Sequence, residues 1–172
     1  AYTRLGGEIL QIEATRFTRK GRLVLTGQLG DVMKESASIA LDYVRTHANE
    51  FKIDPKLFEE NDVHIHVPEG AVPKDGPSAG VTMTTALVSC FSNIPVKANL
   101  AMTGEVTLRG NVLPIGGLKE KSLAAHRSGI DTILIPKENV KDLDDIPQEV
   151  KDAVTFIPCS NVSQVLHNAL VK

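Results

Sequence analysis

Residues 62–91 read DVHIHVPEGAVPKDGPSAGVTMTTALVSCF, and they include the most informative stretch of the chain, residues 68–80. Its first six residues alternate in polarity, which predicts a strand with Val63, Ile65 and Val67 on one face. Residues 68–77 hold three prolines and two glycines, so they form neither a helix interior nor a central strand. Small residues and then an apolar run follow, which predicts a buried helix that closes this loop. Ser78 is therefore expected near a helix N-terminus.

The residues before this stretch predict two strands and a helix. Residues 7–14 alternate in polarity and residues 22–27 have strand character after a basic turn, so together they are expected to form a hairpin. Asp31 is in place to cap a helix that runs to about Asn49, because apolar residues recur there at helical spacing.

The residues after it continue to alternate between strands and helices. Residues 98–103 and 105–108 are strand candidates, the second forming a hairpin with Val112 and Leu113. A helix opens at Gly117 and closes at Gly129, and Ser160 is expected to cap the last helix. Further elements are expected at 132–135 (strand), 139–143 (helix) and 154–157 (strand). The chain is thus predicted to be one α+β domain, residues 1–172, with two layers, mixed sheets and packed helices.

Composition excludes several classes of protein. The formal net charge of -2 gives no basic field for nucleic acid, so no such partner is expected. No apolar run is long enough to span a bilayer, and no signal peptide is evident, so a cytoplasmic location and no membrane partner are expected. Cys90 and Cys159 form no CxxC pair, which indicates neither a zinc site nor a disulfide framework.

Ser78 is the first candidate for chemistry. A rigid loop delivers its hydroxyl to a helix start, where unpaired backbone N–H groups can bind an oxyanion and the small Ala79 and Gly80 allow close approach. A serine needs a base within hydrogen-bond reach to act as a nucleophile. The ordinary alternative is that Ser78 only caps the helix.

Lys121 is the candidate base. The residues three and four positions from it on the expected helix are small or apolar, whereas Lys119 points toward the arc of Leu123 and His126 and is expected to be the solvated lysine of the two. A lysine in apolar surroundings is desolvated, which favours its neutral amine near neutral pH. The alternative is that its butyl chain covers apolar surface while its ammonium group reaches water.

Two rival interpretations use the same loop. Residues 76–80 match G-x-S-x-G, which would suit a Ser-His-Asp hydrolase with Asp142 and His167, but about ten turn residues separate the strand from Ser78 where a nucleophile elbow needs a direct turn. A phosphate cradle is the second rival, although the loop lacks a Walker lysine.

Other polar residues offer weaker candidates. His64 and His66 share a strand face with Asp62 and could ligate a metal, but there is no HExxH motif and no third convincing ligand. Thr103 and Glu105 flank Gly104, where they could orient an amine or simply form a turn.

Three motifs resemble the ATP-dependent Lon protease family, and the resemblance covers essentially the whole chain. They are KDGPSAG (74–80), TGEVTLRG (103–110) and LPIGGLKEK (113–121). In that family the serine of the first motif attacks the peptide and the second lysine of the last motif activates it, which implies Ser78 and Lys121 here. The resemblance also implies that Thr103 hydrogen-bonds the lysine and that Asp75 switches the site between closed and open forms.

The resemblance implies a Lon-type α+β peptidase domain that assembles into a homohexameric ring behind an AAA+ ATPase module. The chain contains no G-x-x-x-x-G-K-[ST] run, so ATP and Mg²⁺ are expected only in an ATPase module outside it, and no cofactor is expected in this domain. Unfolded, misfolded and regulatory proteins are the implied substrates. A fragment of this kind, lacking the ATPase and the N-terminal substrate-binding module, is expected to degrade folded proteins poorly.

Overall fold

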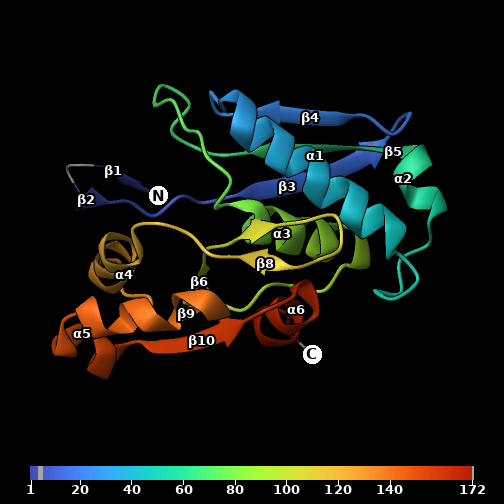
Figure 1. The fold of residues 1–172 in the computed structure, drawn as a ribbon. Coiled ribbons are helices and arrows are strands. Elements are labelled where there is room, and N and C mark those ends of the chain that lie inside the picture. The colour runs from blue at the N-terminus through green and yellow to red at the C-terminus, as the bar shows by residue number, and fades with distance from the viewer. Residues whose placement is uncertain (4–5, 172) are drawn as a thin grey trace.

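A computed structural model of the chain describes residues 1–3 and 6–171, and it confirms the α+β class (Figure 1). The helices are α1 (Asp31–Thr46), α2 (Lys56–Glu60), α3 (Gly80–Ser92), α4 (Leu118–Arg127), α5 (Gln148–Ala153) and α6 (Val162–Ala169), with a 3-10 helix η1 (Lys137–Asp145). The strands are β1 (Tyr2–Thr3), β2 (Gly6–Gly7), β3 (Glu13–Thr18), β4 (Leu23–Thr26), β5 (Asn61–His66), β6 (Leu100–Met102), β7 (Glu105–Val106), β8 (Val112–Leu113), β9 (Thr132–Pro136) and β10 (Thr155–Cys159).

Two three-stranded sheets flank α3 (Figure 1). The first has the order β3-β5-β4 and lies with α1, and the second has the order β10-β9-β6 and lies with α4, α5 and α6. Helix α3 packs against α1, β3 and α6. The short strands β7 and β8 form the predicted hairpin.

The predicted hairpin between the first two strands is wrong. Strand β5 lies between β3 and β4, antiparallel to the first and parallel to the second. The buried carboxylate of Asp62 on β5 explains part of this arrangement, because it accepts hydrogen bonds from the backbone N–H groups of Lys20 (3.3 Å) and Arg22 (2.8 Å) in the β3–β4 connection. The Arg22 N–H bond lowers the pKa of the Asp62 carboxyl below its usual value.

The C-terminal helices also differ from the prediction. Asn161, not Ser160, caps α6, and its side chain accepts a hydrogen bond from the backbone N–H of Gln164 at 2.9 Å. The expected helix at 139–143 is the longer 3-10 helix η1, and the short helix α5 has no counterpart in the prediction. Six residues after a proline give too short a pattern for helical periodicity to show.

The core consists of two apolar clusters that meet along β6 and β9. The larger cluster lies among β5, α1, α3 and α6, and the smaller one lies among α4, α5 and β9. Side chains on β9 alternate between them, because Leu134 belongs to the larger cluster and Ile133 and Ile135 belong to the smaller one. Helices α3 and α4 are therefore anchored in different clusters. Within the described residues, no helix is long and apolar enough to cross a bilayer.

The loop between β5 and α3 is held by the buried side chain of Lys74. Most carbonyls of this loop lie outside any sheet, so they need other hydrogen-bond donors. The Lys74 ammonium group donates to the carbonyl oxygens of Gly27 (2.9 Å), Glu69 (2.7 Å) and Val72 (2.9 Å). Its backbone N–H also donates to the carbonyl of Gln28 at 3.0 Å. Lys74 thus ties residues 69–74 of the loop to the β4–α1 connection.

Replacing Lys74 by methionine is expected to destabilise the protein by about 3 kcal/mol, because three carbonyls lose charge-assisted hydrogen bonds in a buried site. Urea unfolding followed by circular dichroism measures the change. The exposed Lys119 provides the control, since Lys119→Met removes an equal charge without a buried partner. Equal midpoints for Lys74→Met and the parent would contradict this account of the loop.

Candidate active site

Ser78 lies two residues before α3, where the sequence placed it. Its carbonyl accepts a hydrogen bond from the backbone N–H of Gly104 at 2.8 Å, and the N–H of Val81 donates to the carbonyl of Gly104 at 3.1 Å. Gly80 allows this close docking, because a Cβ there would lie only 3.0 Å from the backbone nitrogen of Val106. The turn that carries Ser78 is thus paired directly with the segment that follows β6.

Lys121 lies half-buried on α4, and Lys119 is exposed, as the helix-face prediction requires. The Lys121 amine donates to the hydroxyl of Thr103 at 3.2 Å and lies 5.5 Å from the ring centre of Tyr2. Burial lowers its pKa from 10.5 to about 8. A lysine with this pKa is partly neutral at physiological pH and can accept a proton.

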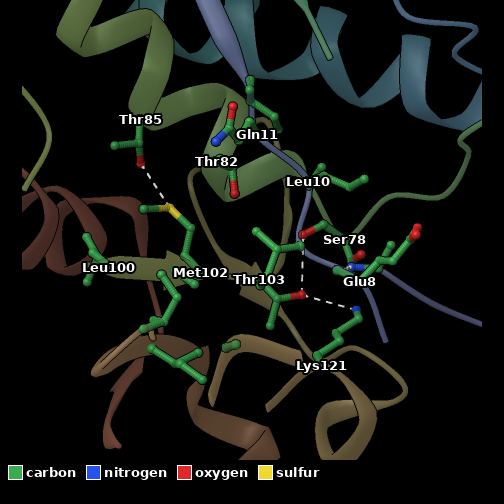
Figure 2. Close-up of a pocket in the computed structure, with 18 of the residues that line it drawn as sticks. Glu8, Leu10, Gln11, Ser78, Thr82, Thr85, Leu100, Met102, Thr103 and Lys121 are labelled. Carbon is green, nitrogen blue, oxygen red and sulfur yellow. Dashed lines mark hydrogen bonds between the residues drawn. The ribbon is translucent and has the colours of Figure 1, made fainter. Parts of the chain in front are cut away.

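Thr103 connects the two candidate residues (Figure 2). Its buried hydroxyl accepts from Lys121 and lies 3.5 Å from the backbone carbonyl of Ser78, to which it donates. Among the described residues, Ser78 and Lys121 make no direct side-chain hydrogen bond, but both line the same pocket. Such bonds are often loose in resting enzymes and tighten when substrate binds.

Asp75 lines the pocket as well, but its carboxylate is directed to the start of α1. It accepts hydrogen bonds from the backbone N–H groups of Met33 (2.9 Å) and Gly76 (2.8 Å), and the Met33 bond is the main cause of its lowered pKa. The predicted cap of α1 is therefore wrong, because Gly30 holds the N-cap position and Asp75 supplies the carboxylate in place of Asp31. In the described structure Asp75 makes no ion pair with Lys121, and its switching role stays a prediction.

The pocket has a volume of about 500 Å³ and a largely apolar lining. Figure 2 shows Leu10 of the N-terminal segment near Ser78 and Gln11 near Thr82, with Met102 and Leu100 of β6 across the cavity. Residues 8–13 were not expected at the site, because they reach it through long-range contacts, the pairing of β3 with β5 and the packing of β2 against α4. The cavity can receive an apolar side chain next to the serine.

The rival interpretations gain no support from the geometry. Neither Asp142 nor His167 lines the pocket of Ser78, and the Asp142 carboxylate accepts a hydrogen bond from Asn139 at 2.7 Å. The N–H groups of Gly80 and Val81 already donate to backbone carbonyls, which leaves a poor cradle for phosphate.

The histidine pair on β5 is bound to a neighbouring strand. His64 and His66 each lie within hydrogen-bond distance of the Thr26 hydroxyl, at 2.8 and 2.6 Å. Within residues 1–3 and 6–171, no group of three or more histidines, cysteines or carboxylates is arranged to hold a metal ion. Glu105 lies on β7, and it does not line the pocket.

Comparison with known proteins gives the family. The model of the Lon protease (S16) C-terminal proteolytic domain matches residues 1–172. The chain belongs to this family. It is 59% identical to the Lon protease of Brevibacillus choshinensis over its whole length and 61% identical to that of Bacillus thuringiensis over 99% of it. Lon protease 1 of Bacillus subtilis is 58% identical over 99% of the chain. The chain spans only 22% of the length of each of these three relatives.

The Lys121 amine is expected to titrate near pH 8, because burial disfavours the ammonium form. The Cε resonance of Lys121, assigned by its loss in Lys121→Met, can be followed by ¹³C NMR as the pH is raised. A midpoint near the ordinary lysine value of 10.5 would show that the side chain reaches water instead.

Proposed function

We propose that this domain is a serine endopeptidase in which Ser78 is the nucleophile and Lys121 its general base. The observation that carries the proposal is a half-buried lysine amine, with its pKa lowered to about 8, in the same pocket as a serine at a helix start. Membership of the Lon proteolytic family supports the same chemistry. No cofactor is needed for it in this domain.

Neutral Lys121 takes the proton of the Ser78 hydroxyl as the oxygen attacks a peptide carbonyl. The tetrahedral intermediate then collapses, the peptide C–N bond breaks, and Lys121 returns the proton to the departing amine. An acyl-enzyme remains on Ser78. In the second half, Lys121 takes a proton from water, the hydroxide oxygen attacks the ester, and the released Ser78 oxygen recovers the proton.

The oxyanion is bound by backbone N–H groups at the turn before α3. The N–H groups of Gly80 and Val81 are engaged, whereas no partner within the described residues takes those of Ser78 and Ala79. These two adjacent N–H groups are therefore proposed as the donors. Thr103 holds the Lys121 amine on the side of the pocket where Ser78 lies, and its bond to the Ser78 carbonyl keeps the two elements in register.

Polypeptides in an extended conformation are the proposed substrates, with an apolar side chain in the pocket beside Ser78. Unfolded, misfolded and regulatory proteins fit this requirement, because a folded protein does not offer an extended segment to a pocket of this size. Protein quality control is the biological role that we propose on this basis.

The whole protein is proposed to add what this domain does not supply. By analogy with the Lon family, an AAA+ ATPase module that binds ATP and Mg²⁺ unfolds substrates, and the subunits assemble into a homohexameric ring in the cytoplasm. Asp75 is proposed to switch the site, because its carboxylate lines the pocket of Lys121 while it is bonded to α1. Movement of α1 would release the carboxylate toward the lysine.

Cleavage of a short fluorogenic peptide tests the proposal directly. Ser78→Ala and Lys121→Ala are each expected to reduce kcat by at least about 10³-fold, because a nucleophile and its base act as a unit. Lys119→Ala, on the exposed side of α4, is the matched control and is expected to retain activity. Cleavage that persists in Ser78→Ala would overturn the proposal. If the parent does not cleave, labelling of Ser78 by a fluorophosphonate, read by mass spectrometry, decides whether the serine is activated.

The pH dependence of kcat/KM is expected to follow the lysine. Since the base must be neutral, activity rises about tenfold per pH unit below the Lys121 pKa and levels off above about 8. The measurement is a pH–rate profile from pH 6 to 10 on the same peptide. A flat profile across this range would remove Lys121 from the role of base.

A further inference from the structure

Asn139 is a buried polar residue that the proposed reaction does not use. It lies on η1 and is 2% exposed. Both the oxygen and the nitrogen of its side-chain amide bond to the backbone of Ile115. Its side-chain oxygen accepts from the Ile115 N–H at 2.9 Å, and its side-chain nitrogen donates to the Ile115 carbonyl at 2.9 Å. The same nitrogen donates to the Asp142 carboxylate at 2.7 Å, which fixes the orientation of the amide. Asn139 therefore acts on Ile115 as a neighbouring strand would.

The bonded peptide lies just before the helix that carries Lys121. Gly117 holds the N-cap position of α4 in a left-handed conformation, with φ at 75°, and no side chain caps this helix. The first helical hydrogen bond that reaches Lys121 runs from its N–H to the carbonyl of Gly117 at 3.0 Å. Only Gly116 separates Gly117 from the clamped residue. The direction of the first turn of α4 therefore depends on how Ile115 is held.

We infer that Asn139 is a positioning residue that holds the first turn of α4 so that the Lys121 amine stays against Thr103 and away from water. The inference rests on the proposed role of Lys121 as base. Without the clamp, two backbone groups of the half-buried Ile115 lose their partners, and the loop must shift to satisfy them. The start of α4 then shifts, and the long side chain of Lys121 gains access to solvent.

The electrostatic surroundings of Lys121 allow this effect to be isolated. The charged groups that share its pocket are Glu8, Glu13, Asp75 and the Ala1 amino group, and Glu120 precedes it on α4. The Tyr2 ring faces the amine, and Asp142 is the charged partner of Asn139 on η1. Because Asn139 is neutral, its replacement by a neutral residue changes none of these charges. A change in the Lys121 pKa then reports how the lysine and its charged neighbours are placed and hydrated, and not an added or removed charge.

The experiment compares two variants of Asn139 with a matched control. Asn139→Ala removes the clamp, and Asn139→Leu removes it while filling the space, which limits the loss of packing. Asn61→Ala is the control, because Asn61 is also buried and also donates to a backbone carbonyl, that of Leu57, at 2.9 Å. Asn61 does not line the pocket of Lys121. Urea unfolding of all three variants measures the stability lost in each.

The readout is the titration of the Lys121 Cε resonance by ¹³C NMR, together with the pH profile of peptide cleavage. We expect both Asn139 variants to move the midpoint from about 8 toward 10.5, the ordinary lysine value. A midpoint of about 10 would lower the neutral fraction at pH 7.5 about 75-fold, and kcat/KM would fall by the same factor and recover at high pH. Asn61→Ala is expected to lose stability and keep the parental midpoint.

A parental midpoint in either folded Asn139 variant, or an equal shift in Asn61→Ala, would overturn the inference. The titration does not depend on turnover, so it decides the role of Asn139 even if the parent cleaves no peptide. Failure of the proposed function would appear separately, as cleavage that survives Ser78→Ala.

Discussion

The parallel pairing of β6 with β9 is the constraint on which the site depends. It sets Met102 opposite Leu134, and the N–H of Thr103 extends it by donating to the carbonyl of Leu134 at 3.2 Å. Thr103 is thus fixed where the two core clusters meet. The turn of Ser78, which leads into α3, and the side chain of Lys121 on α4 both bond to the segment 103–104. Helices α3 and α4, which belong to different core clusters, are therefore placed relative to each other by the residues that follow β6.

The cost of burying a charged amine accounts for the lowered pKa of Lys121, and the hydrogen-bond partner of this amine, Thr103, is neutral. A carboxylate bound to the amine would favour the ammonium form and raise its pKa, which would leave the lysine charged at neutral pH. The Asp75 carboxylate, which lines the same pocket, is instead bonded to two backbone N–H groups, those of Met33 and Gly76. In the described structure the carboxylate is thus bonded to these N–H groups and makes no ion pair with the lysine.

The sequence predicts those features that depend on local pattern and fails for those that depend on distant partners. The loop before Ser78 follows from its prolines and glycines, and the buried face of Lys121 follows from its neighbours at helical spacing. The insertion of β5 between β3 and β4 could not be predicted. Strands β3 and β4 follow each other in the sequence, and nothing in their local pattern distinguishes a hairpin from pairing with a third strand. The capping of α1 by Asp75 joins residues more than forty positions apart, and no local motif signals it.

The loops before the two proposed catalytic residues are each bonded to a buried side chain, one charged and one neutral, and this difference has a physical reason. Lys74 holds the loop before Ser78 with an ammonium group bound to three carbonyls, whereas Asn139 holds the loop before Lys121 with a neutral amide. An ammonium group beside α4 would lower the Lys121 pKa further, and a carboxylate would raise it. Asn139 adds no charge near α4, so burial remains the cause that lowers the Lys121 pKa.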